Sequence, residues 1–273
     1  MTIGIWILGD QLWTEQSALA SCADQQKKTP VILIESIQHV QERSYHKQKL
    51  VLVWSAMRHF AEELREADWQ VTYCEQAKEF KPPLKKWIQE NQITELRVME
   101  PSDRPFAEFI QSLDLPCDIR LIPNNHFLWH TDEFATWAKP RKRLLMEDFY
   151  REGRRRFNLL MEGDKPAGGR WNFDQENRQP PKGKLNPPKP LWFKPNQITQ
   201  TVIQQVNALK IPTYGVAEPF RWAVTRSQAL QVLDHFIQTR LPAFGPYQDA
   251  MVTGQETLWH ALLSPYLNLG LLH

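Results

Sequence analysis

Residues 3–12 read Ile-Gly-Ile-Trp-Ile-Leu-Gly-Asp-Gln-Leu, a short apolar run that ends at Gly9 and is followed by polar side chains. Such a run predicts a buried strand, and the glycine marks the turn that closes it. Four more short apolar runs follow in the first 125 residues, at 31–34, 70–73, 95–99 and 118–122. Since helix-like segments separate several of these runs, the pattern predicts an α/β fold with a doubly wound parallel sheet.

The helices between the runs have recognisable sequence signals. Pro82 and Pro83 introduce a short helix, and Ser102 or Asp103 is expected to cap another, with Pro105 in its first turn. The clearest helix lies between the second and third runs, where one amphipathic face is formed by Val53, Met57, Phe60, Ala61 and Leu64.

The amino-acid composition of the chain changes after residue 125. The stretch 139–156 holds eight basic and three acidic residues, and 163–196 is rich in Gly, Pro, Lys and Asn, which is typical of an irregular connector. Helical signals return late: Thr225 and Gln228 predict a capping box, and Ser264 with Pro265 predicts a helix start. We expect an α/β domain over 1–125, a connector over 126–213 and the beginning of a helical domain over 214–273.

Composition narrows the class of protein. The chain has 273 residues, of which 42% are apolar, and a formal net charge of +2, which excludes a disordered chain. No uncharged apolar stretch reaches 18 residues and the N-terminus lacks a signal leader, so we expect a cytoplasmic protein without a membrane partner. Cys22, Cys74 and Cys117 are odd in number and far apart, which argues against a disulfide framework or a metal site.

Polar residues at the predicted strand ends form the first candidate site. Asp10 and Gln11 follow the first strand, and Glu35 ends the second, at the sheet edge where open α/β proteins bind ligands. No Gly-x-Gly-x-x-Gly fingerprint is present, so a polyol-bearing ligand fits better than an ordinary dinucleotide. Lys47 and Lys49 could bring cations to the same edge. The alternative is that these residues bind no ligand. Asp10 and Gln11 would then belong to a capped turn, Glu35 to a solvated strand end, and the two lysines to a solvated helix start.

Two later features allow more than one interpretation. The basic stretch 139–156 can contact a phosphate backbone, or it can be the solvated face of a packed helix. The start of the helix at Ser264 offers free N–H groups to an anion, although most such starts bind nothing.

Four segments together resemble a known family: Gly9–Leu12, 168–178 (Gly-Gly-Arg-Trp-Asn-Phe-Asp-Gln-Glu-Asn-Arg), 244–251 and 258–272 (Leu-Trp-His-Ala-Leu-Leu-Ser-Pro-Tyr-Leu-Asn-Leu-Gly-Leu-Leu). They are similar to the photolyase-related proteins of the cryptochrome/photolyase superfamily, in the branch of iron–sulfur bacterial cryptochromes and prokaryotic (6-4) photolyases. The resemblance covers nearly the whole chain. It implies a Rossmann-like antenna domain, a linker and the beginning of an all-α FAD-binding domain.

The resemblance also implies cofactors and an activity. The antenna domain would hold 6,7-dimethyl-8-ribityllumazine, and FAD would pass an electron, after photoreduction, to a (6-4) photoproduct in damaged DNA. A blue-light photoreceptor without repair activity has the same architecture. The implied antenna residues are Gly9, Asp10, Gln11, Glu35, Lys47 and Lys49. The implied flavin-side residues are Tyr247, Asp249, His260, Ser264 and Asn268, and the candidate DNA contacts are Arg154, Arg155, Arg170 and Arg178.

The chain departs from the family pattern in two respects. An iron–sulfur cluster needs four cysteines and only three are present, so no such cluster is expected. Family members also continue past the last segment, so we expect an N-terminal portion that is inactive alone and has a separately encoded C-terminal portion as a candidate partner. Its last leucines are then expected to lack packing partners: Leu262, Leu263, Leu267, Leu269, Leu271 and Leu272. A rival hypothesis is a light-independent protein that binds a nucleotide or nucleic acid.

Overall fold

The computed structural model describes residues 2–180 and 185–273 and divides the chain into two compact units. The first contains the chain up to Leu128 together with Leu191–Leu233 and Leu263–His273, and the second contains Trp129–Pro190 and Asp234–Leu262. The units are therefore discontinuous in sequence. The expected boundary at 213 falls inside a segment of the first unit.

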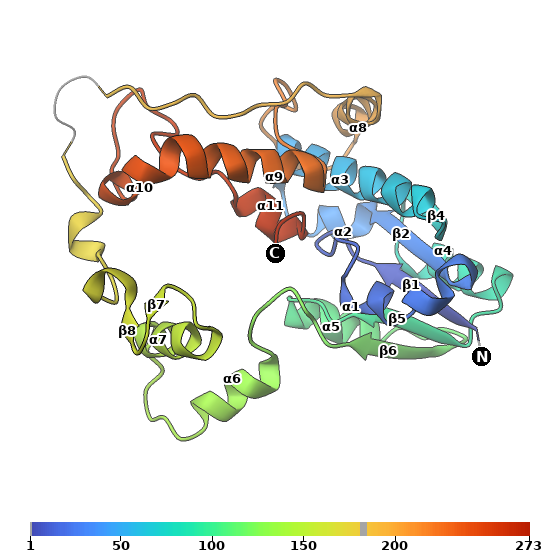
Figure 1. Ribbon diagram of the computed structural model, residues 1–273. Helices are drawn as coiled ribbons and strands as arrows, with labels where there is room; N and C mark the ends of the chain where they lie inside the picture. The colour runs from blue at the N-terminus through green and yellow to red at the C-terminus, as the bar shows by residue number, and fades with distance from the viewer. Residues whose placement is uncertain (1, 181–184) are drawn as a thin grey trace. The chain divides into compact units, whose positions relative to one another are not determined.

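A five-stranded parallel sheet forms the centre of the first unit (Figure 1). All five predicted strands are confirmed, and their order in the sheet is β4-β2-β1-β5-β6. This is the doubly wound Rossmann-like arrangement, in which the chain moves outward from β1 in both directions. The strands are β1 (Ile3–Ile7), β2 (Pro30–Ser36), β4 (Gln70–Ala77), β5 (Glu95–Met99) and β6 (Asp118–Ile122).

Alternate residues of the central strands face two separate cores, as the pleat requires. Ile5 and Ile7 belong to the core under α3 (Lys47–Glu66), whereas Trp6 packs on the opposite face. That second core also contains buried residues of α4 (Lys81–Glu90). Because helices cover both faces of the sheet, the central strands β1 and β2 are buried along nearly their whole length, whereas the edge strands β4 and β6 also carry exposed residues.

Local capping fixes the start of two helices at the carboxyl edge of the sheet. Asp103 Oδ2 accepts a hydrogen bond from Phe106 N at 3.3 Å, which caps α5 (Arg104–Gln111) and confirms one of the two predicted caps. His46 Nδ1 accepts from Gln48 N at 3.1 Å at the start of α3. These bonds satisfy backbone donors that have no partner within the helix.

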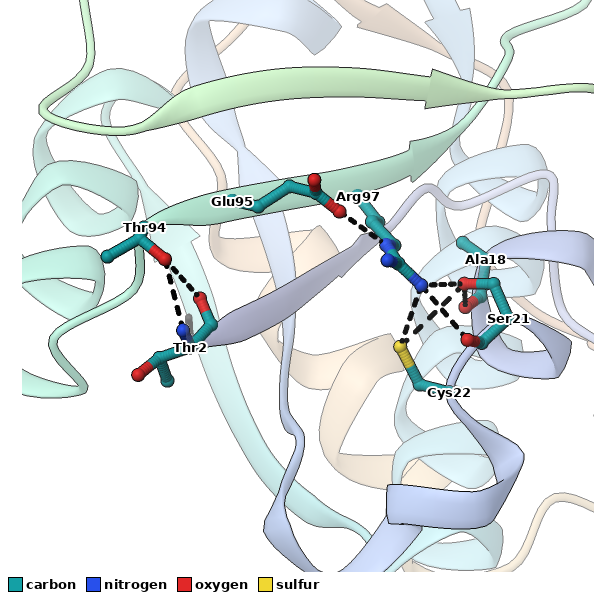
Figure 2. A network of polar contacts seen from close by, with 7 residues as sticks. All are labelled: Thr2, Ala18, Ser21, Cys22, Thr94, Glu95 and Arg97. Atoms are coloured by element: carbon teal, nitrogen blue, oxygen red, sulfur yellow. Dashed lines mark hydrogen bonds and ion pairs between the residues drawn. The ribbon is translucent and has the colours of Figure 1, made fainter.

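Arg97 joins β5 to the turn after α1 (Ser17–Ala20), as Figure 2 shows. Its Nε lies 2.6 Å from Glu95 Oε1, and its Nη1 donates to the carbonyl and the hydroxyl of Ser21 at 2.9 and 3.0 Å. The same nitrogen lies 3.4 Å from Cys22 Sγ. Cys22 is buried in the core, so these contacts give this thiol a structural environment.

Two segments from the middle of the sequence complete the first unit. The helix α8 (Gln197–Ala208) packs on α3, and β9 (Thr213–Tyr214) pairs in parallel with β3 (Tyr45–His46). Further on, Thr225 Oγ1 accepts from Gln228 N at 3.2 Å before α9 (Arg226–His235). The Gln228 side chain accepts from Val224 N rather than from Thr225 N, so the predicted capping box is only half formed.

The C-terminal segment confirms one expectation and corrects another. The helix α11 (Ser264–Leu269) begins at Ser264, as predicted, although Leu263 is its N-cap residue and no side chain caps it. Leu269, Leu271 and Leu272 are buried, so the prediction that they lack packing partners is wrong for these three, whereas Leu267 is 44% exposed. The reason is that this segment returns to the α/β unit, where Leu12 N donates to the carbonyl of Leu269 at 3.0 Å.

Gly270 allows this return. Its φ of +77° is in the left-handed region that favours glycine, and a Cβ at this position would lie 2.5 Å from the Trp13 ring. Residues 254–263, in the part of the chain expected to begin a helical domain, form turns and irregular backbone apart from an isolated bridge at Gln255.

The second unit is built from short elements. Its aromatic cluster contains Trp129, Trp137 and Phe149, contributed by α6 (Thr131–Ala138), α7 (Met146–Phe157) and the residues before them. β7 (Met161–Glu162) and β8 (Lys165–Pro166) form a small antiparallel hairpin. Apart from β8 and two 3-10 turns, the described part of 163–196 is irregular, as predicted; residues 181–184 lie outside the described residues. Among the helices that the structure describes, none is long and apolar enough to cross a membrane.

Candidate ligand-binding site

The first unit contains a cavity of about 740 Å³ at the carboxyl edge of its sheet. Its wall includes residues at or shortly after the ends of three strands: Asp10 after β1, Ser36 at the end of β2 and Ser102 after β5. β1 has β2 on one side and β5 on the other, and the chain connections on these two sides run in opposite directions. This reversal opens a crevice at the end of β1. Open α/β sheets bind ligands at such a switch point, as the sequence predicted.

Aromatic rings form one wall of the cavity. Trp6 and Phe80 have ring centroids 5.3 Å apart, Phe80 and Phe106 lie 5.6 Å apart, and His39 lies 5.1 Å from Phe106. The mutual packing of these rings fixes their orientation, which gives a planar ligand a preformed apolar surface.

Gly9 brings the end of β1 close to α3. A Cβ at this position would lie 3.0 Å from Met57 Sδ and 3.2 Å from Val53 Cγ1, both of which belong to α3. Gly9, Val53 and Met57 all line the cavity. A larger residue at position 9 would therefore push α3 away from the sheet and change the shape of the site.

Asp10 is a carboxyl of the cavity wall that lies largely out of the solvent. Burial raises the pKa of Asp10 above its ordinary value, and nearby Asp103 adds to this rise. A backbone hydrogen bond and the imidazoles of His126 and His39 act in the opposite direction. A partly buried carboxyl whose charged form is disfavoured gains from a ligand hydroxyl that donates to it.

Glu35 faces the cavity from the end of β2, but its oxygens are already engaged. Arg58 donates to Oε1 and Oε2 at 2.8 and 3.0 Å, Tyr73 Oη donates to Oε1 at 2.7 Å, and Gln76 N donates to Oε2 at 3.1 Å. Burial, followed by the charge of Glu35, raises the pKa of Tyr73 well above its usual value. Glu35 therefore organises the end of β2 as well as contributing to the wall.

The other predicted antenna residues have different positions. Gln11 is buried and lies outside the residues that line the cavity; its Nε2 donates to the carbonyl of Met99 at 2.8 Å and so ties the ends of β1 and β5 together. Lys49 lines the cavity, with its Nζ 4.6 Å from the centroid of the Tyr45 ring. Lys47 instead donates to Asn207 Oδ1 at 3.3 Å.

The predicted flavin-side residues divide between the two units. Ser264 and Asn268 belong to the first unit, where Asn268 lines the cavity. In the second unit, the Tyr247 ring stacks on Trp259 at 4.8 Å, and Asp249 Oδ2 accepts from Asn177 Nδ2 at 3.1 Å. His260 also belongs to the second unit, and its Nε2 is buried without a hydrogen-bond partner among the described residues.

The four candidate DNA contacts in the second unit are not equivalent. Arg154 is buried, and its guanidinium donates to the carbonyls of Leu159, Leu160 and Trp171 and to the Tyr150 hydroxyl.

The other three arginines are exposed. Arg170 pairs with Glu176 at 2.8 Å, and Arg178 lies 3.7 Å from Asp249. Arg155 has no acidic partner among the described residues and lies over the Trp171 ring at 4.8 Å. Arg155 is therefore the residue of this set whose charge is free to meet a phosphate.

Sequence reasoning missed several residues of the cavity. His39, Ser102 and His126 line it, yet none was proposed as a site residue. The sequence did contain a signal that could have identified Ser102 as a site residue, because Ser102 follows the fourth predicted strand at the same edge of the sheet as Asp10. His39 and His126 lie in a short helix and in a loop, and their approach to the cavity depends on how those segments fold back.

The sheet and its cavity define a Rossmann-like α/β protein with room for one small organic ligand at its switch point. The chain belongs to the family of deoxyribodipyrimidine photo-lyase-related proteins, whose model matches residues 5–222.

Two known proteins are similar to the chain in sequence. The chain is 41% identical, over 277 aligned positions, to a (6-4) photolyase of Agrobacterium fabrum; the alignment covers 98% of this chain and 54% of that protein. A shorter match of 38 residues, 42% identical, covers 14% of this chain and 19% of the uncharacterized protein R852 of Acanthamoeba polyphaga mimivirus. The chain thus spans about half the length of the photolyase it matches.

Proposed function

We propose that the chain is the antenna-bearing part of a photolyase- or cryptochrome-like flavoprotein, and that its cavity binds 6,7-dimethyl-8-ribityllumazine. The observation that carries the proposal is the cavity itself, in which an aromatic wall and polar strand ends line the same space. The Phe80 and Phe106 rings suit a planar heterocycle, and Asp10 and Ser102 suit the hydroxyl groups of a ribityl chain. The family resemblance supports this ligand.

Reconstitution with the lumazine tests this proposal. We expect stoichiometric binding, seen as quenched or shifted lumazine fluorescence after gel filtration. Phe106→Ala removes part of the aromatic wall and should weaken binding, whereas Phe173→Ala is a matched control, because Phe173 is half exposed and belongs to the other unit. Failure of the wild-type chain to retain the lumazine would contradict the proposal.

Asp10→Ala probes the polar side of the cavity. Loss of a buried hydrogen-bond partner should reduce the binding free energy by about 1–3 kcal/mol. Glu35→Ala should also lower retention, but it disrupts Arg58 and Tyr73 as well, so Asp10 is the cleaner probe. Unchanged retention in both variants would place the ligand elsewhere.

For the whole protein we propose light-driven repair of (6-4) photoproducts in damaged DNA. The name of the Agrobacterium relative and the photolyase-related family support this activity. When bound, FAD supplies the electron that the reaction needs. From the family resemblance we propose Tyr247, Asp249, His260, Ser264 and Asn268 as flavin contacts of this chain. Arg155 is the foremost of the proposed DNA contacts.

A light-dependent assay with an oligonucleotide that carries a (6-4) photoproduct tests the activity. We expect no repair by this chain alone, and repair when a polypeptide matching the remaining half of the Agrobacterium photolyase is supplied with FAD. Light-dependent repair by the chain alone would show that it is sufficient. No repair by the combined protein, together with a light-dependent flavin signal, would favour the photoreceptor alternative.

A light-independent nucleotide- or nucleic-acid-binding protein is the alternative from another class. The observation that favours it is the exposed Arg155 of the second unit, which lies over the half-buried Trp171 ring. It predicts a colourless preparation that retains no lumazine and binds nucleic acid in a salt-dependent way.

A further inference from the structure

The C-terminal segment Leu263–His273, which contains α11, supplies part of the wall of the cavity in the first unit. Leu267, Asn268, Leu269 and His273 line this cavity, although they lie far in sequence from the strand ends that form its other walls. The last helix of the chain is therefore a component of the candidate site.

The loop after β1 is shared by the cavity and by the C-terminal segment. Asp10 lines the cavity, and two residues later Leu12 N donates to the carbonyl of Leu269 at 3.0 Å. The next residue, Trp13, is buried, and its ring stacks on the His273 imidazole with centroids 5.3 Å apart. A ligand that holds Asp10 in place therefore also holds the backbone that receives α11.

Two anchors outside the cavity lining also hold the C-terminal segment. Arg226 Nη1, at the start of α9, donates to the carbonyl of Leu271 at 3.0 Å and lies 3.2 Å from His273 Nδ1. Tyr266 Oη accepts from Ala223 N at 3.2 Å. Since Arg226 and Tyr266 do not line the cavity, they can affect a ligand there only through the position of this segment.

The helix α11 is too short to hold its position by itself. It has six residues, and isolated helices shorter than about 12–15 residues are marginal in water. Within the described chain no side chain caps its start, and Gly270 ends it in the left-handed conformation. Its order therefore depends on the surfaces against which it packs, and the cavity is one of them.

We propose that ligand binding in the cavity and docking of the C-terminal segment are coupled, so that each stabilises the other. The inference rests on the proposed function, because it takes the lumazine as the ligand. If the cavity is complete only when the segment is docked, the apparent affinity falls in proportion to the docked fraction. By thermodynamic linkage, bound lumazine favours docking by the same factor. Since α11 begins at Ser264, a proposed flavin contact, the antenna ligand also orders part of the flavin side.

Lumazine affinity in variants tests the coupling without changing a residue of the cavity wall. Gly270→Ala places a Cβ 2.5 Å from the Trp13 ring at a residue whose φ is +77°, so it should displace the segment. Fluorescence titration should then show binding weakened by about tenfold or more, as when the docked fraction falls to about a tenth.

Gly254→Ala is the matched control for this substitution. Gly254 has the same φ of +77° but belongs to the second unit, and no described atom lies within 4 Å of a Cβ placed there. It should bind lumazine as the wild type does. If Gly270→Ala fails to fold, Arg226→Met still tests the inference, because it removes an anchor outside the cavity lining and should also weaken binding.

Hydrogen exchange of the wild-type chain measures the coupling in the other direction. Bound lumazine should slow exchange in peptides covering 264–272 by about tenfold, the factor that linkage requires. Peptides of α8 should slow less, because α8 belongs to the same unit but lies outside the cavity lining.

Equal slowing of both segments would indicate global stabilisation by the ligand alone and would overturn the inference. Wild-type affinity in a folded Gly270→Ala variant would overturn it as well, while leaving the lumazine assignment intact. Failure of the wild-type chain to bind lumazine would overturn the proposed function together with this inference, so the two failures are distinguishable.

Discussion

Arg58 and Glu35 form a buried two-point ion pair that joins the middle of α3 to the end of β2. Nε lies 2.8 Å from Oε1 and Nη2 lies 3.0 Å from Oε2, with side chains 8% and 0% exposed. Such parallel hydrogen bonds fix both the distance and the orientation of the two groups. The pair thereby sets the geometry of one side of the cavity.

Glu35→Gln should destabilise the chain by about 3–5 kcal/mol, because it leaves Arg58 buried beside a neutral group. The loss should fall near the lower end of that range, since Glu75 lies 3.3 Å from Arg58. Urea unfolding measures the effect. Glu108→Gln breaks the exposed pair with Arg104 and should cost less than about 1 kcal/mol. Equal losses in the two variants would contradict this assignment of a buried pair.

Asp10→Asn should stabilise the chain at pH 7 and not at pH 3. Burial raises the pKa of Asp10 from its ordinary value of 3.8, so the folded state holds the proton more tightly than the unfolded chain does. The stabilisation from the protonated form is complete below the unfolded pKa and is lost as pH rises through the folded pKa. Ionised Asp10 therefore costs stability at pH 7, and asparagine removes that cost.

Melting temperatures at the two pH values check this prediction for Asp10. Asp114→Asn is the control, because Asp114 is an exposed carboxyl near Lys81 and should show no such gain. A lower melting temperature of Asp10→Asn at pH 7 would mean that the charged carboxyl is stabilised in the cavity.

Arg154 and Arg155 are neighbours in sequence with opposite expected roles. Arg154→Met should destabilise the second unit by about 2–4 kcal/mol, because buried carbonyls lose their donors. Arg155→Met should change stability by less than about 0.5 kcal/mol. In DNA binding, it should lower the salt-dependence slope by about 1, as expected for one lost phosphate contact. Thermal unfolding and fluorescence anisotropy at several salt concentrations separate the two roles. A larger loss of stability in Arg155→Met than in Arg154→Met would refute the assignment.

Asp103 and Ser264 provide a test of helix capping. Asp103→Ala should cost about 0.5–2 kcal/mol, because its side chain accepts from Phe106 N at the start of α5. Ser264→Ala should be neutral within about 0.5 kcal/mol, because Ser264 is exposed and makes no capping hydrogen bond. Guanidinium unfolding measures both, and a larger loss for Ser264→Ala would show that this helix begins one residue later.

The candidate site could be predicted only where it depends on strand ends. Asp10 and Glu35 were found because residues after parallel strands meet at one edge of the sheet. The hydrogen-bond partners of Glu35 were not predicted, because Arg58 lies 23 positions and Tyr73 lies 38 positions from Glu35 in the sequence. No local pattern encodes such pairs, so Glu35 looked like a free acceptor while its oxygens already accept four hydrogen bonds.

The sequence by itself determined the five strands, their separating helices and the Asp103 cap, because these follow from local apolar periodicity and backbone capping. The tertiary structure alone decided where distant segments go. Leu269, Leu271 and Leu272 return to the α/β unit, Arg154 is buried while Arg155 is exposed, and Arg240 is enclosed without an acidic partner in the described chain. Burial depends on which surfaces meet, and a hydrophobic or charged residue carries no local signal of the surface that will cover it.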